Sequence, residues 1–154
     1  MASLVYNNAM LKAWKGEVDL QEAGDDIRVA LVMTNTTADT EEESTTIDSF
    51  TTFDEMDGSA YARKTLASQA VAIDTVNDRV EFDHEDLTWT TLGNGTRAIQ
   101  GMVYFSHGEI AGTGTDFGAV PYQFTEFSVT QNPGGSNFTV TIDAEGAFQL
   151  AQGA

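Results

Sequence analysis

The sequence predicts an all-β protein, a β-sandwich or jelly-roll-like barrel, with a short N-terminal helix and a long polar loop. Segments in which apolar and polar residues alternate recur at intervals of roughly 8–12 residues, a spacing typical of such folds. Gly, Asn and Asp turns separate these segments. With 154 residues the chain can bury a core without cross-links. We therefore expect one β-rich domain over residues 1–154.

The N-terminal region is predicted to contain the helix. Tyr6, Met10, Leu11 and Trp14 have the spacing of one helical face, and Gly16 is the expected stop. Residues 1–8 carry no charged side chain, and we expect them to form an arm that a neighbouring molecule can capture. The candidate contact residues of this arm are Leu4, Val5 and Tyr6.

The segment 34–58 is the long polar loop, rich in threonine and acidic residues. A loop of this length in a small protein usually has a function. It carries spaced apolar residues, of which Ile47, Phe50 and Phe53 are candidate anchors for a partner. In the alternative interpretation these residues, with Met56, fold back as a lid on the sheet.

The remaining regular elements are predicted to be strands. A buried strand is expected at Ile27–Met33, and a hairpin begins near Ala70. Two short strands should flank the turn Ala144–Gly146 at the end of the chain. The inward phase of the strands predicts these core residues: Leu31, Leu66, Ile73, Phe82, Trp89, Val103 and Phe105. Further aromatic residues expected in the core are Trp14, Tyr104, Phe124 and Phe138.

Composition excludes several classes of function. The 24 acidic residues outnumber the seven basic ones and give a net charge of −17. Such a charge argues against nucleic acids and anionic membranes as partners. It favours solubility and a basic or cation-screened partner. The chain has no cysteine, which excludes disulfides, thiol catalysis and zinc sites built on thiolates. Without a recognisable secretion signal or membrane helix, we expect a protein that stays inside a cell or an assembly made there.

The acidic run 74–86 raises the question of a metal site. Asp74, Asp78 and Glu85 match positions one, five and twelve of a calcium-binding loop. However, Val76 and Arg79 stand where that loop needs an oxygen ligand and a glycine. The run also alternates like a strand, which divides its carboxylates between two faces. We interpret it as the solvated outside of a hairpin, and no cofactor is expected. The minor metal candidates are Asp74, Asp78, Asp83 and Glu85.

No set of catalytic residues can be assembled from the sequence. His84 and His107 are interpreted as surface histidines, and the carboxylates around His84 are expected to raise its pKa. The triplet Asp116–Gly118 matches a kinase motif only in isolation, because the other kinase motifs are missing. The chain is therefore predicted not to be an enzyme.

Two sequence boxes carry a resemblance to a known family. The first is G-x-x-Y-x-R-x-x-L at residues 58–66, and the second is V-x-F-x-x-x-x-x-T-W at residues 80–89. With the preceding segments "LVYNNAMLKAWKG" and "IRVALV", they resemble small structural proteins of tailed bacteriophages over Leu4–Phe105. Within the first box, Arg63 either pairs with Glu55 or Asp57 and pins the loop, or contacts the capsid directly.

The resemblance implies a non-enzymatic virion protein. The role that fits best is a capsid decoration, or cement, protein that binds and stabilises the outer surface of the phage head. It would be made in the bacterial cytoplasm and would bind the major capsid protein, as a dimer or trimer of its own chain. Two alternatives stay open. One is a tail or baseplate accessory protein, and the other is a calcium-dependent carbohydrate-binding β-sandwich.

Overall fold

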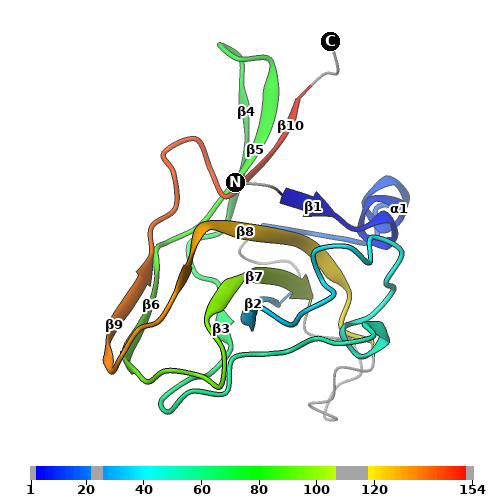
Figure 1. The fold of residues 1–154 in the computed structure, drawn as a ribbon. Coiled ribbons are helices and arrows are strands. Elements are labelled where there is room, and N and C mark those ends of the chain that lie inside the picture. Colours follow the sequence, from blue (N-terminus) through cyan, green and yellow to red (C-terminus); the bar gives the residue numbers. More distant parts are fainter. Residues whose placement is uncertain (1–2, 22–25, 107–117, 152–154) are drawn as a thin grey trace.

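The computed structural model is mostly β, with 42% strand and 9% helix (Figure 1). It describes residues 3–21, 26–106 and 118–151. The strands form several antiparallel sheets beside one short α-helix, which confirms the predicted β-rich class. In chain order the elements are β1 (Ser3–Val5), α1 (Asn7–Lys15), β2 (Ile27–Met33), η1 (Ile47–Ser49), β3 (Lys64–Thr65), β4 (Ala70–Asp74), β5 (Arg79–Asp83), β6 (Leu87–Leu92), β7 (Ile99–Ser106), β8 (Pro121–Gln131), β9 (Ser136–Val140) and β10 (Phe148–Ala151).

A five-stranded antiparallel sheet forms the centre of the body, in the order β1-β8-β7-β2-β3. β2 begins and ends at the predicted residues, and six of its seven side chains are buried because neighbours cover both of its faces. β7 pairs along nearly all of β2 on one side and along β8 on the other. These long ladders of non-local pairs position everything else in the fold.

The buried hydrophobic side chains form one cluster around this sheet. Six of the seven predicted core residues belong to it: Leu31, Leu66, Phe82, Trp89, Val103 and Phe105. The aromatic residues Tyr104 and Phe124 are buried as well, and Phe138 packs against the cluster. Ile73 is the wrong prediction, because 75% of this residue is exposed. It lies on a strand that leaves the body.

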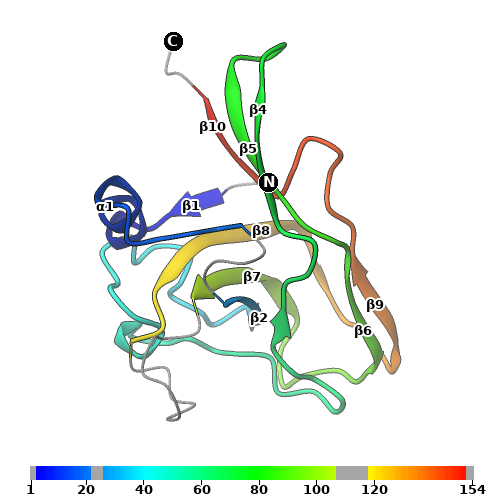
Figure 2. The same ribbon diagram turned by 180° about the vertical axis from the view of Figure 1, so that it is seen from behind.

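Two smaller sheets complete the architecture. β6 pairs with β9 along one side of the body, and the sheet β10-β5-β4 rises away from it (Figures 1 and 2). We call the sheet β10-β5-β4 the projecting sheet. The two C-terminal strands, β9 and β10, flank the predicted turn at Gly146, but they join different sheets.

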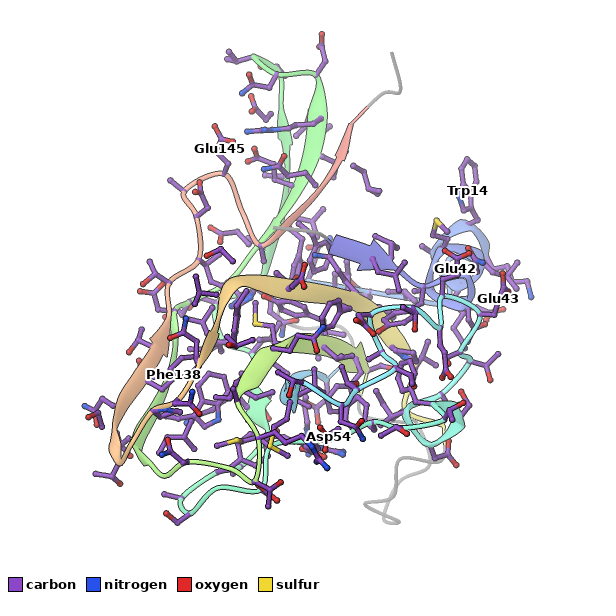
Figure 3. The ribbon with its side chains drawn as sticks, in the orientation of Figure 1. Trp14, Glu42, Glu43, Asp54, Phe138 and Glu145 are labelled. Carbon is purple, nitrogen blue, oxygen red and sulfur yellow. The ribbon has the colours of Figure 1, made fainter. Side chains whose placement is uncertain are left out.

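Helix α1 ends where the sequence predicts. Gly16 has φ 68°, and its N–H donates to the Ala13 carbonyl while the next N–H donates to the Lys12 carbonyl. This left-handed residue closes the helix as glycine commonly does. The expected burial of Trp14 is wrong, because the residue is 91% exposed (Figure 3). The helix buries only Ala9 against the body. Among the described helices, none combines the length and the hydropathy that crossing a bilayer requires.

The close approach of β7 and β8 at Gly101 gives a first prediction. A Cβ atom at this position would lie 2.4 Å from the Thr125 carbonyl oxygen and 2.8 Å from the Phe124 ring. Because backbone cannot yield as a flexible side chain can, we expect Gly101→Ala to lower the free energy of unfolding by about 3 kcal/mol. Urea unfolding would measure the loss. The control Ser128→Ala, at an exposed position of β8, should stay within about 0.5 kcal/mol. A loss below about 1 kcal/mol for Gly101→Ala would contradict the packing described.

Candidate docking surface

The N-terminal residues proposed as a free arm are part of the fold. Leu4 and Val5 lie in β1, which pairs with β8 opposite Phe124 and Gln123. Tyr6 is fully buried, and its hydroxyl donates a 2.6 Å hydrogen bond to the Ala38 carbonyl. The prediction of a free arm is therefore wrong for residues 3–8, because backbone pairing and burial hold them. Of Leu4, Val5 and Tyr6, only Val5 has an exposed side chain.

The loop 34–58 folds back on the body. Ile47 and Phe50 are buried, as is Met56, and Phe53 is half-buried. The Phe50 ring meets Tyr6 edge-on and stacks on Phe53, with ring centroids 5.5 Å apart in both pairs. The lid interpretation is confirmed, and the expectation that Ile47 and Phe50 present free anchors to a partner is wrong. Replacing Phe50 would open the core, because its ring packs between two aromatic neighbours.

Arg63 holds the loop as one of the two sequence interpretations predicts. Its Nε and Nη2 donate to the two carboxylate oxygens of Glu55 at 2.8 and 2.6 Å. Tyr61 also donates to Glu55, at 2.7 Å, and accepts a hydrogen bond from the Leu31 N–H. Burial, followed by the charge of Glu55, raises the pKa of the Tyr61 hydroxyl. Arg63 thus fixes Glu55, near the end of the loop, to the segment before β3 through a bidentate pair, and Tyr61 links the same carboxylate to β2.

The acidic run forms a β-hairpin, as predicted. β4 and β5 pair in register from Ala70 opposite Asp83 to Asp74 opposite Arg79. Hydrogen bonds donated by the Asn77 side chain and by the Val76 and Asn77 N–H groups lower the pKa of Asp74. Glu85 instead accepts a hydrogen bond from Ser68. Within the described ranges, no three His, Cys, Asp or Glu side chains come together as metal ligands would.

His84 is buried, so its assignment as a surface histidine is wrong. Its Nδ1–H donates to the Glu85 carbonyl at 2.7 Å, and Nε2 accepts a hydrogen bond from the Tyr104 hydroxyl at 3.1 Å. Burial lowers its pKa from the ordinary 6.5, against smaller raising effects of the Glu85 carbonyl, Asp83 and Asp86. The predicted rise in pKa is therefore wrong, because desolvation outweighs the nearby carboxylates. His107 lies outside the described residues.

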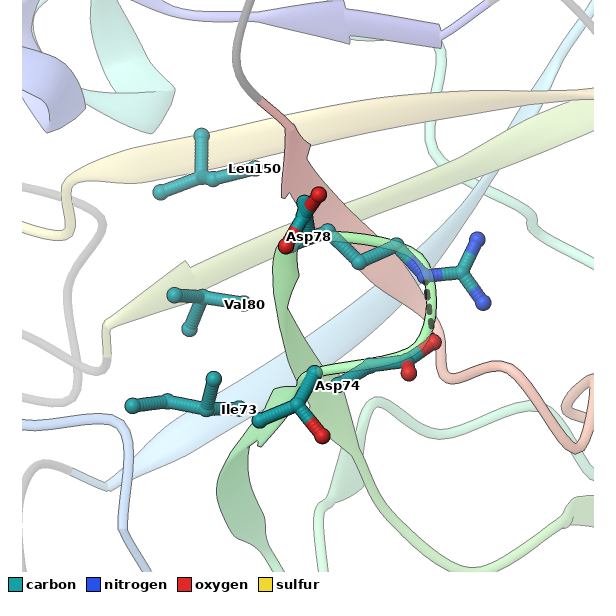
Figure 4. Close-up of a pocket in the computed structure, with 7 residues that line it drawn as sticks. Ile73, Asp74, Asp78, Val80 and Leu150 are labelled. Carbon is teal, nitrogen blue, oxygen red and sulfur yellow. Dashed lines mark hydrogen bonds and ion pairs between the residues drawn. The ribbon is translucent and has the colours of Figure 1, made fainter.

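The projecting sheet has one apolar face and one polar face. The register places Val71, Phe82 and Phe148 in a row next to the body. Ile73, Val80 and Leu150 form the next row outward, and we call these three residues the outer row. Their side chains lie side by side and line one shallow concavity (Figure 4). Ile73 and Leu150 are 75% and 67% exposed, and Val80 between them is 37% exposed, so the row faces solvent.

Charged side chains occupy the opposite face. Arg79 is its centre, with ion pairs to Asp74 at 3.2 Å, Glu81 at 2.8 Å and Glu145 at 3.2 Å. Its side chain is shielded among these groups, although Glu145 itself lies out in solvent (Figure 3). This network fixes the hairpin and the loop before β10 to each other. The outer row therefore lies on a sheet whose opposite face is held by ion pairs within the chain.

A second apolar surface adjoins the outer row. A groove separates α1 and β1 from β10, and its walls are almost entirely hydrophobic. Met10 lies in the groove wall, and beyond it α1 also exposes the large apolar side chains of Leu11 and Trp14. The main residues of the groove are Val5, Ala9, Met10, Val18, Tyr122 and Leu150. Contiguous exposed apolar surface is typical of contact sites with other macromolecules.

Sequence reasoning did not identify the outer row as a candidate site. Alternation placed Ile73 on an apolar face, but periodicity does not say whether anything covers that face. One signal was available: β4 reads Ala-Val-Ala-Ile, with alanine where a solvated strand would carry polar residues. None of the protein families, curated proteins and solved structures compared with this chain matches it.

The burial of His84 predicts how stability depends on pH. Because its folded pKa is lowered, the unfolded chain takes up the proton first as the pH falls through about 6.5, and stability falls with it. We expect the urea midpoint to decrease between pH 7.5 and 5.5 by more than it does in His84→Gln, which cannot take up that proton. Equal decreases in the two proteins would contradict this role of His84.

The hairpin interpretation of the acidic run gives a separate prediction. Asp78→Asn and Glu85→Gln should each change the free energy of unfolding by no more than about 0.5 kcal/mol, as ordinary surface changes do. Millimolar calcium should leave the melting temperature unchanged, with magnesium as the control for ionic strength. A calcium-specific rise of many degrees, lost in Asp78→Asn, would show that these carboxylates form a metal site.

Proposed function

We propose that this chain is a non-enzymatic structural protein of a bacteriophage virion, and specifically a decoration protein that seats on the outer surface of the capsid. The observation that carries the proposal is the outer row: Ile73, Val80 and Leu150 stand unpartnered on a sheet raised from the body. In this proposal the body has the sandwich or jelly-roll arrangement predicted from the sequence. Its five-stranded sheet and the β6–β9 ladder contribute to one core.

The chemistry of the surface supports docking. Covering a large aliphatic side chain stabilises a complex by on the order of 1–2 kcal/mol, so the outer row alone can supply a useful part of an interface. The net charge of −17 keeps free copies soluble and apart. A partner with an apolar centre and a basic rim would complement both features. On a capsid lattice, many modest contacts of this kind can act together through effective concentration.

The buried polar groups support a structural role. Tyr6, Tyr61 and Tyr104 have raised pKa values, in each case chiefly because burial disfavours the phenolate. Each hydroxyl is engaged by a neighbour that holds a loop or strand in place: Ala38 for Tyr6, Glu55 for Tyr61 and His84 for Tyr104. These hydroxyls therefore hold parts of the fold together through partners within the chain.

The test of location uses intact particles. Antibody labelling of purified phage, or separate analysis of isolated heads and tails, should find the chain on heads in many copies. Labelling confined to tails would contradict the decoration role and favour the tail or baseplate accessory role. Absence from both would contradict the virion proposal altogether.

The contact surface is tested by its own variant. Ile73→Ser combined with Leu150→Ser should reduce occupancy on particles at least roughly tenfold, because two exposed anchors are lost while the core is untouched. Quantitative gel analysis of saturated particles would measure occupancy. The matched control is Val129→Ser, which removes a similarly exposed (66%) apolar side chain from β8. Equal occupancy of the two variants would contradict docking through the outer row.

A further inference from the structure

The outer edge of β4 is an unprotected edge of the projecting sheet. β4 is the outermost strand of the projecting sheet, and all of its residues except Asp74 are exposed. It pairs with β5 over all five residues without a register shift. Most natural edges are protected by lysine, proline, a bulge or brevity. The edge strands β1 and β3 have three and two residues, and β10 has four. The β6–β9 ladder is interrupted by a register shift between Trp89 and Leu92, whereas β4 has five residues and none of those protections.

The sequence of β4 is complementary to itself. When Ala-Val-Ala-Ile-Asp is laid antiparallel on a second copy with Ala72 opposite Ala72, position 71 meets position 73. Val71 would then lie beside Ile73 of the second copy, on the apolar face. Ala70 would lie opposite Asp74 of the second copy, on the polar face. No like charges meet, although the chain is strongly acidic.

We propose that a second copy of this chain pairs with β4 edge to edge, about a two-fold axis at Ala72. Such an isologous antiparallel contact satisfies the free backbone groups of both edges. The axis is perpendicular to the sheet, so the apolar faces of both copies lie on the same side. The resulting six-stranded sheet carries two outer rows, each with Ile73, Val80 and Leu150. The pairing does not depend on the proposed virion role, but it would double the docking surface used there.

Charge opposes the association in a measurable way. Each copy carries a net charge of −17, so dimers should be scarce at low ionic strength. The screening length falls from about 10 Å at 0.1 M salt to about 3 Å at 1 M. The dimer fraction should therefore rise with salt and with protein concentration. Sedimentation equilibrium of the purified full chain would measure both dependences.

Cysteine cross-linking tests the register, because the chain has no cysteine of its own. Directly opposite Cα atoms in an antiparallel pair lie roughly 4.5–5.5 Å apart, within the range of a disulfide. Ala72→Cys should form a covalent dimer under mild oxidation. Ala70→Cys alone should not, because its two copies would lie about four residues apart along the strands, but it should cross-link when mixed with Asp74→Cys. Val129→Cys measures random collision.

Lysine substitutions test the same register without a covalent bond. Ala72→Lys places two ammonium groups opposite each other and should weaken the dimer at least tenfold. Ala70→Lys places its ammonium opposite Asp74 of the second copy and should leave the dimer as tight or tighter. Circular dichroism would verify that both variants fold, as expected for exposed positions.

Three results would overturn the proposal. One is a monomer at every salt and protein concentration. Another is cross-linking of Ala72→Cys no faster than that of Val129→Cys. The third is equal weakening by the two lysine variants, which would show that any dimer uses another surface. These measurements use purified protein alone, so they remain separate from the particle-binding test of the proposed function.

Discussion

A cluster of four rings, three of them buried, joins the projecting sheet to the body, and the candidate docking surface depends on it. Phe82 and Phe148 stack with centroids 4.5 Å apart, and Tyr104 of the central sheet meets Phe148 edge-on at 5.6 Å. His84 meets both Phe82 and Tyr104, and its hydrogen bonds to Tyr104 and to the Glu85 carbonyl fix the chain where it leaves the hairpin. Phe82 and Phe148 belong to the projecting sheet and His84 directly follows β5, so this packing orients the whole projecting sheet.

The consequence of this junction is a division of the apolar face into two parts. The row nearest the body is absorbed into the core through Phe82 and Phe148, while the next row stays in solvent. The alternating pattern of the projecting sheet therefore provides core residues for stability and exposed residues for contact. On the other face, the ion pairs of Arg79 brace the hairpin without using apolar surface. A rigid, braced sheet loses little conformational entropy on binding, which favours it as a docking element.

Charge and apolar surface have complementary roles in this molecule. Unprotected strand edges and exposed aliphatic rows promote association, and a chain with little net charge would risk aggregation through them. The large acidic excess opposes uncontrolled contact between free copies. Contact between two copies then requires a strand register that keeps like charges apart. Contact with another protein requires a partner with a basic rim. The proposed capsid contact and the proposed edge-to-edge dimer both follow from this balance.

Local pattern determined much of the fold. The buried strand β2, the hairpin of the acidic run, the end of α1 at Gly16 and most of the core could be predicted. Alternation, turn residues and the left-handed preference of glycine act over short distances along the chain. The pairing of Arg63 with Glu55 was also foreseeable, since few basic residues are available to so many carboxylates.

Tertiary structure alone decided which predicted faces are covered. Ile73 and Leu31 have the same kind of strand pattern, yet Leu31 lies in the middle of a five-stranded sheet and Ile73 on a sheet that leaves the body. Phe50 and Tyr6 are enclosed because segments distant in sequence close over them, and His84 loses its expected charge for the same reason. Periodicity fixes the side of a strand on which a residue lies. Burial depends on what packs there, which is a property of contacts between distant segments.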